Sequence, residues 1–116
     1  MEITIYHNPR CSKSRQTLAL LEDNGVSPII IDYLQAPPTH QQLDSILRGL
    51  EMQPRELMRK GEVLYKELEL KDDALSRDQL IDAMVQNPKL IERPIVIAGD
   101  EIIIGRPPEN VLTILP

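Results

Sequence analysis

The chain is poor in cysteine, histidine and aromatic residues, and these shortages exclude several classes of protein. Its 116 residues include one cysteine, two histidines, three tyrosines, and no tryptophan or phenylalanine. One cysteine excludes an internal disulfide, and with two isolated histidines it also excludes a zinc cluster of Cys and His ligands. A chain of this length can bury one apolar core without such help. We therefore expect one domain over residues 1–116, with no metal site and no bound cofactor.

Long apolar runs and an excess of positive charge are also missing. No apolar run approaches the length of about 20 residues that a membrane-spanning helix needs. The first six residues alternate as in a strand and lack the basic and apolar regions of a signal peptide. The net charge of −5 argues against a general nucleic-acid surface. The sequence thus predicts a cytoplasmic protein that binds neither membranes nor nucleic acids.

The first third of the chain has the pattern of a strand, a helix and a second strand. Residues 3–6 alternate, and a turn follows at Cys11. A helix is expected next, with Asn24-Gly25 as its stop signal. Its inner face consists of Ser14, Thr17, Leu18 and Leu21. Residues 28–33 form a continuous apolar run, which is typical of a strand covered on both faces, so we expect two parallel strands joined by a crossover helix.

Helical patterns dominate the middle of the chain. Thr39 with Gln42, and Ser76 with Gln79, have the spacing of capping boxes at the starts of two helices. Apolar residues recur at helical spacing after each box. Two further short helices are expected over residues 53–60 and 65–70.

Strand character returns near the C-terminal end. Residues 94–97 and 102–104 flank a tight connection, which predicts a β-hairpin, and Pro107-Pro108 then opens a last helix. The fold class is therefore α/β, with a four-stranded mixed sheet and a helical insertion of about residues 39–90 between the second and third strands. This connectivity predicts a thioredoxin-like fold, in which an active cysteine lies between the first strand and the first helix.

Cys11 lies at this strand-to-helix turn. The first N–H groups of a helix lack partners and the macrodipole adds positive potential, so the thiolate form of a cysteine is favoured there. Arg10, Lys13 and Arg15 add nearby positive charge. The alternative is a buried cysteine that acts only as a small apolar residue, but the basic, turn-forming surroundings favour a reactive thiolate.

The spacing around Cys11 excludes several thiol mechanisms. A dithiol oxidoreductase needs a second cysteine where this chain has Ser14, and a phosphatase-type loop needs an arginine where it has Thr17. A papain-like pair needs a histidine that activates the thiol. His7 is close in sequence, but nothing identifies a group that would orient it. What remains is a lone thiolate with hydroxyl groups nearby.

Four segments of the chain resemble the glutaredoxin-dependent arsenate reductases. They are ITIYHNPRC at residues 3–11 with Ser14-Arg15 after it, LMRK at 57–60, IERPIV at 91–96 and GRP at 105–107. Their order and approximate separation match that family over essentially the whole chain. The combination is more specific than any one segment alone.

The resemblance implies a set of site residues. Cys11 would be the nucleophile, and three arginines would surround the substrate oxyanion: Arg59, Arg93 and Arg106. His7 and Ser14 would help to hold the thiolate. The thioredoxin-like fold further implies a cis peptide bond between Arg93 and Pro94, facing the cysteine.

The resemblance also implies a reaction and its partners. Cys11 attacks arsenate, glutathione joins the adduct as co-substrate, and a glutaredoxin removes it as a mixed disulfide. Two other hypotheses stay open. One is a regulator resembling the Spx-like proteins, which share the fold and bind RNA polymerase, although their Cys-x-x-Cys motif is absent here. The other is a glutathione-dependent thiol reductase with a different substrate.

Overall fold

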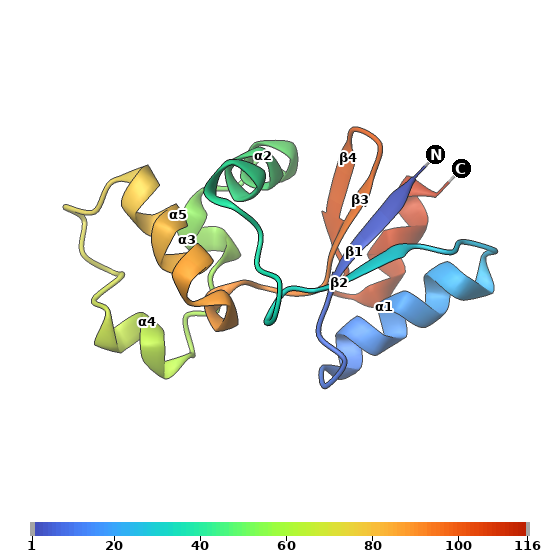
Figure 1. Ribbon diagram of the computed structural model, residues 1–116, viewed down its shortest axis with the longest axis horizontal. Helices are drawn as coiled ribbons and strands as arrows, with labels where there is room; N and C mark the ends of the chain where they lie inside the picture. The colour runs from blue at the N-terminus through green and yellow to red at the C-terminus, as the bar shows by residue number, and fades with distance from the viewer. Residues whose placement is uncertain (1, 116) are drawn as a thin grey trace. The chain divides into compact units, whose positions relative to one another are not determined.

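The structure is a computed structural model that describes residues 2–115. It groups the chain into two compact units. The first, called here the sheet unit, contains the residues up to 36 and those from 93 onward; the second, the helical unit, contains residues 37–92 (Figure 1). The helical unit covers the expected insertion.

A mixed sheet of four strands forms the sheet unit. The strands are β1 (Ile3–His7), β2 (Ile29–Asp32), β3 (Ile95–Ala98) and β4 (Glu101–Ile104), in the order β2-β1-β3-β4. β1 and β2 run parallel with Thr4 opposite Ile29, while β3 is antiparallel to both β1 and β4. The parallel pair, the hairpin and the α/β thioredoxin-like fold class predicted from the sequence are confirmed.

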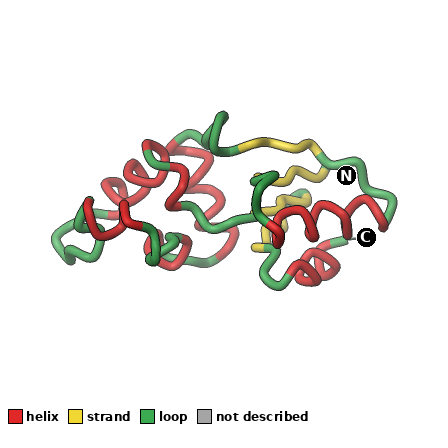
Figure 2. Tube along the Cα trace, turned by 90° about the horizontal axis from the view of Figure 1, so that it is seen from below, coloured by secondary structure: helices red, strands yellow, loops and turns green. Residues whose placement is uncertain are grey.

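Two helices cover one face of this sheet. α1 (Ser12–Asp23) connects β1 to β2, and the 3₁₀ helix η2 (Pro108–Ile114) follows β4; the two pack side by side (Figure 1 and Figure 2). The core between them and the strands consists of Ile3, Ile5, Leu21, Val96, Ala98, Val111 and Ile114. Because full burial of one large aliphatic side chain contributes about 1.5–3 kcal/mol, this cluster is the main source of stability in the sheet unit.

Both ends of α1 follow from the local sequence. Cys11 has an extended backbone and is the N-cap residue, so the helix starts directly after the thiol. Beyond the last turn, Gly25 has a φ of +78°, a conformation that glycine adopts without steric cost, and its N–H donates to the carbonyl of Glu22. The predicted stop at Asn24-Gly25 is confirmed.

The expectation that β2 is covered on both faces is wrong. Ile29 and Ile30 are 45% and 50% exposed. In the described sheet β2 is an edge strand that pairs with β1 alone, so it is not enclosed as a central parallel strand would be. The continuous apolar run therefore predicted the strand correctly, but it did not predict how exposed the strand's side chains are.

Two capped helices dominate the helical unit. Its elements are α2 (His40–Leu50), α3 (Pro54–Leu57), α4 (Val63–Glu67), α5 (Arg77–Gln86) and the 3₁₀ helix η1 (Pro88–Leu90). α2 and α5 start at the two predicted capping boxes and pack on each other. Their fully buried side chains are Leu43, Leu47, Ile81 and Met84. The capping and amphipathic patterns thus located both helices.

The short helices of this unit differ from the expected ones. α3 is shorter than residues 53–60, because Met58 leaves the helix and forms an antiparallel bridge with Ile91. α4 lies earlier than residues 65–70, because Glu69 adopts a left-handed φ of 54° that a helix cannot continue through. Neither an isolated bridge nor a single left-handed residue produces a repeating sequence pattern, so the sequence could not predict where these two helices end.

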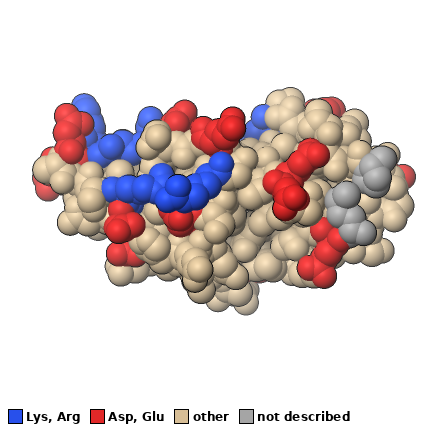
Figure 3. Space-filling model, turned by 90° about the horizontal axis from the view of Figure 1, so that it is seen from above, with Lys and Arg blue, Asp and Glu red and all other residues tan. Residues whose placement is uncertain are grey.

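The helices are short and carry charges of both signs. Within residues 2–115, no helix has the length and apolar character needed to cross a membrane. On the face shown in Figure 3, Lys and Arg side chains over the helical unit lie among Asp and Glu side chains. Charges of opposite sign also pair within the helical unit, where Asp44 binds both Arg48 and Arg77. That face is therefore not a continuous basic surface.

Candidate active site

Cys11 lies in the turn between β1 and α1, as the sequence predicts. Its backbone N–H donates to the carbonyl of Asn8 over 3.0 Å, and its carbonyl accepts from the N–H of Arg15, also over 3.0 Å. The residue is 8% exposed, so the sulfur is shielded without being sealed from solvent. These bonds fix the thiol at the start of the helix.

The surroundings of Cys11 lower the pKa of its thiol below the ordinary value of 9.0. Burial would raise this pKa, but the N–H of Ser14, the charge and hydrogen bonding of Arg93 and the N–H of Lys13 together outweigh it. The N–H groups of the first helical turn have no partner within the helix, so they are available to the sulfur. The site therefore favours the nucleophilic thiolate.

Arg93 and Arg106 both lie beside this thiol. The Nη2 of Arg106 is 3.6 Å from the sulfur of Cys11, and the side chain of Arg93 also donates a hydrogen bond to it. The Nε of Arg106 donates to the backbone carbonyl of Arg93 over 2.8 Å. Guanidinium groups keep their charge and offer paired donors, so two of them at one thiolate form a site suited to an anion. The sheet unit thus brings Cys11 and two of the predicted arginines together.

Both of these arginines precede a proline in the cis conformation. The bond between Arg93 and Pro94 is cis, which confirms the prediction. The bond between Arg106 and Pro107 is cis as well, and the sequence did not indicate it. One arginine lies before the β3–β4 hairpin and the other after it.

His7 and Ser14, the predicted helpers, bind each other. The Nδ1 of His7 and the Oγ of Ser14 are 2.6 Å apart, and the N–H of Asn8 donates to the same oxygen over 3.0 Å. Burial, more than the opposing charge of Asp32, lowers the pKa of His7, so the imidazole is neutral at neutral pH. Ser14 acts on Cys11 through its backbone N–H, while its hydroxyl is engaged by His7.

Arg59 belongs to the helical unit, where a carboxylate holds its guanidinium. Its Nη1 is 2.7 Å from Oε1 of Glu62, and the two side chains are 31% and 29% exposed. Its backbone N–H donates to the carbonyl of Leu90 over 2.7 Å, next to the Met58 bridge. The role of Arg59 as a ligand of the oxyanion stays a prediction.

The sequence did not assign Thr17 and Asn110 to the site. The buried hydroxyl of Thr17 lies within hydrogen-bond distance of the carbonyls of Lys13 and Gly105, at 2.8 and 3.3 Å. The side-chain amide of Asn110 donates to the carbonyl of Arg106 over 3.0 Å. The position of Thr17 on the predicted inner face of a helix was a usable signal, because a buried hydroxyl needs a hydrogen-bond partner. Asn110 is exposed and gave no such signal.

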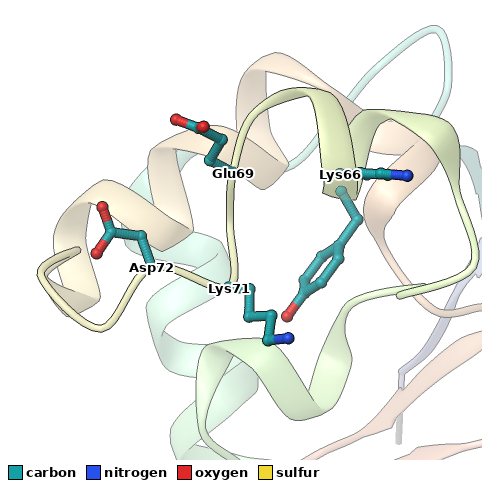
Figure 4. A pocket seen from close by; sticks show the side chains of 5 residues that line it. Lys66, Glu69, Lys71 and Asp72 are labelled. Carbon is teal, nitrogen blue, oxygen red and sulfur yellow. The ribbon is translucent and has the colours of Figure 1, made fainter.

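An open surface cavity of about 410 Å³ lies on the helical unit. Its lining consists of Tyr65, Lys66, Glu69, Lys71 and Asp72. In Figure 4 the carboxylates of Glu69 and Asp72 point away from the amino groups of Lys66 and Lys71. The predicted site residues are not among its lining, so this cavity does not enter the assignment of the active site.

Known proteins resemble this chain along nearly its whole length. Residues 6–114 match the model of the ArsC family. The uncharacterized protein YfgD of Escherichia coli K12 is 56% identical over 115 residues, which cover 98% of this chain and 97% of that protein. A Haemophilus influenzae protein named arsenate reductase is 52% identical over 116 residues, covering 99% and 100%. A solved structure described as an arsenate reductase from Vibrio cholerae superposes with a TM-score of 0.96 at 52% identity, covering 99% of this chain and 98% of that one.

Proposed function

The chain belongs to the ArsC family, and we propose on that basis that it is an arsenate reductase, which converts arsenate to arsenite. The observation that carries the proposal is the position of Arg93 and Arg106 beside a thiol whose pKa is lowered. Relatives that are named arsenate reductase support the same substrate. In this proposal Cys11 is the nucleophile, the three arginines bind the oxyanion, and His7 and Ser14 support the thiolate.

The arginines beside Cys11 suit a tetrahedral, multiply charged anion. Each guanidinium offers two parallel N–H groups together with a positive charge. The same charges offset the repulsion between the thiolate and the incoming anion. As sulfur attacks arsenic, negative charge moves onto a leaving oxygen, and nearby N–H donors stabilise it.

The reaction that follows conserves atoms and electrons. The thiolate of Cys11 forms a bond to arsenic(V) while hydroxide or water leaves. A glutathione thiolate displaces a second oxygen and joins the adduct. A glutaredoxin thiolate then attacks the glutathione sulfur and forms a mixed disulfide with it. The bond between arsenic and the glutathione sulfur breaks, and its electron pair stays on arsenic, which becomes arsenic(III). Hydrolysis releases arsenite and restores Cys11.

The single cysteine supports external thiols as electron donors. The chain has one cysteine, so it cannot form an internal disulfide after the reduction. Glutathione and a glutaredoxin supply the two thiols that become a mixed disulfide. Both are kept reduced in the cytoplasm, where we place the protein, and the scheme uses no resident cofactor or metal.

Arsenate-dependent NADPH oxidation, coupled through glutathione reductase, tests this proposal. With glutathione and glutaredoxin, the native protein turns over and Cys11→Ser does not. Robust turnover with thioredoxin and its reductase alone contradicts the proposed donors. Reduction of glutathione mixed disulfides without arsenate turnover would favour the thiol-reductase hypothesis, and co-purification with RNA polymerase would favour the Spx-like one.

A further inference from the structure

The backbone around Arg106 is held on both sides of the residue. The carbonyl of Gly105 accepts a hydrogen bond from the hydroxyl of Thr17 over 3.3 Å, and its N–H donates to the carbonyl of Pro94 over 2.9 Å. The carbonyl of Arg106 accepts from the amide of Asn110 over 3.0 Å. The two peptide units that flank the Arg106 side chain are therefore held by groups from α1 and from η2, and the preceding Ile104–Gly105 peptide is held by the segment before β3.

Thr17 connects this segment to the helix that starts at the thiol. Its side chain is fully buried, and its single hydroxyl proton is shared between the carbonyls of Gly105 and Lys13. Lys13 lies in the first turn of α1 and contributes its own N–H to the sulfur of Cys11. One hydroxyl thus ties the start of α1 to the chain that carries Arg106.

The approach of the two segments is close enough to depend on a glycine. A Cβ atom at Gly105 would lie 2.5 Å from the Oγ1 of Thr17 and 2.9 Å from the Cγ of Pro94. Real Cβ atoms essentially never make contacts this short, so the missing side chain lets the Gly105 carbonyl reach Thr17. Any larger residue at position 105 would therefore push the Arg106 segment away from α1.

We propose that Thr17 and Asn110 are positioning residues, which hold Arg106 at the distance from Cys11 that oxyanion binding requires. This inference rests on the proposed function. Arg106 places its Nη2 3.6 Å from the sulfur and its Nε against the Arg93 carbonyl, so a shift of its backbone changes both contacts. Displacement of a binding group by about 1 Å can reduce catalysis by about 100-fold. Thr17 and Asn110 act on the substrate through Arg106.

A threonine series separates positioning from simple packing. Thr17→Val keeps the shape of the side chain and removes the hydroxyl, whereas Thr17→Ser keeps the hydroxyl and removes a methyl group. We expect Thr17→Val to raise the KM for arsenate by about 10-fold with the KM for glutathione unchanged, and Thr17→Ser to stay within about twofold of the native protein. Asn110→Ala should raise the arsenate KM by about threefold. Asn24→Ala removes a comparable amide-to-carbonyl bond at the far end of α1, to Leu20, and is the matched control.

A second readout does not need arsenate turnover. The rate at which iodoacetamide alkylates Cys11 below the pKa of its thiol reports how well the surrounding donors hold the thiolate. At a pH below that pKa, Thr17→Val should slow this rate by about threefold, while Thr17→Ser and Asn24→Ala should not. Arsenate should protect native Cys11 from alkylation, and this protection should weaken in Thr17→Val.

The outcomes distinguish a failure of the positioning proposal from a failure of the proposed arsenate reductase function. If arsenate does not protect the native protein and is not turned over, the proposed function fails. The alkylation rates measured without arsenate still show whether Thr17 affects the Cys11 thiolate. The inference is overturned if Thr17→Val matches the native protein in both readouts, or if Thr17→Ser is as impaired as Thr17→Val. Circular dichroism checks folding. If Thr17→Val does not fold, the test passes to Asn110→Ala, whose position is exposed. An unchanged KM for arsenate in Asn110→Ala then overturns the inference.

Discussion

The side chain of Arg106 donates a 2.8 Å hydrogen bond from its Nε to the backbone carbonyl of Arg93. The two residues lie at opposite ends of the β3–β4 hairpin, so this bond closes the hairpin at its base. It leaves the Nη2 of Arg106 directed at the sulfur of Cys11. The two arginines therefore form one arrangement, and a change at either one is expected to affect the other.

Arg106→Lys should impair arsenate reduction although it keeps the positive charge. Lysine lacks the planar fork that lets Arg106 bind the Arg93 carbonyl and the thiol together. A hydrogen bond to a charged group contributes about 1.5–3 kcal/mol, so kcat/KM for arsenate should fall by about 10-fold to 150-fold. Steady-state kinetics check this, with Arg48→Lys on the exposed surface of α2 as the control. An unchanged kcat/KM in Arg106→Lys would show that charge alone suffices.

Arg93→Ala should raise the pKa of the Cys11 thiol. Arg93 lowers this pKa through its charge and its hydrogen bonding, so its removal leaves the opposing effect of burial less compensated. The pH profile of Cys11 alkylation should shift to higher pH relative to the native protein. Arg10→Ala should leave the profile in place, because the groups that lower this pKa are Ser14, Arg93 and Lys13, and the exposed Arg10, although expected from the sequence to contribute, is not among them. Superimposable profiles for Arg93→Ala and the native protein would contradict the assigned role.

His40 should stabilise the helical unit more at low pH than at high pH. Its Nδ1 is 2.6 Å from Asp82 and its Nε2 is 3.2 Å from Asp78. The bond to Asp82 is the main cause that raises the pKa of His40 above 6.5. A raised pKa means that the stabilisation is fully present below the unfolded value and is lost as the pH rises through the folded value.

Thermal unfolding checks the role of His40. The difference in midpoint between the native protein and His40→Gln should be larger at about pH 5.5 than at about pH 9. Because His40, Asp78 and Asp82 are exposed, salt should reduce the difference at the lower pH. A difference of equal size at both pH values would contradict the ion-pair account.

Glu62→Gln should strengthen arsenate binding. The carboxylate of Glu62 pairs with Arg59, so an oxyanion that uses Arg59 has to compete with it. Partly exposed pairs contribute about 0.2–1 kcal/mol, so the KM for arsenate should fall by about 1.5-fold to fivefold. Arg59→Ala should change the KM in the opposite direction. Glu67→Gln on the exposed surface of α4 is the matched control, and identical kinetics for Glu62→Gln and Glu67→Gln would contradict the proposed role of Arg59.

Local patterns predicted the part of the site that depends on neighbours in sequence. The break between a strand and a helix placed Cys11 at a helix start, and the capping boxes located α2 and α5. Arg93 and Arg106 were assigned by resemblance, and the structure places both beside the thiol. The helix start and the capping boxes depend on short stretches of chain and can be recognised without tertiary contacts, whereas the two arginines are distant from Cys11 in sequence and were assigned by the resemblance alone.

Contacts between distant segments could not be predicted in this way. Thr17 meets Gly105 across 88 positions of sequence, and the spacing within either segment does not encode the meeting. His7 and Ser14 were both expected to help hold the thiolate, but the hydroxyl of Ser14 is engaged by His7, and it is the backbone N–H of Ser14 that reaches the sulfur. The exposure of Ile29 depends on the position of β2 at the sheet edge, which is a property of the assembled sheet.

The most direct test of the account is the amount of arsenite formed from arsenate in the presence of glutathione and glutaredoxin, measured by separating the arsenic species. The account predicts multiple turnovers by the native protein, none by Cys11→Ser, and a loss of at least about 10-fold in Arg93→Ala. Arsenite formation by Cys11→Ser at the native rate would contradict the assignment of Cys11 as nucleophile. Absence of arsenite with the native protein would contradict arsenate as its substrate.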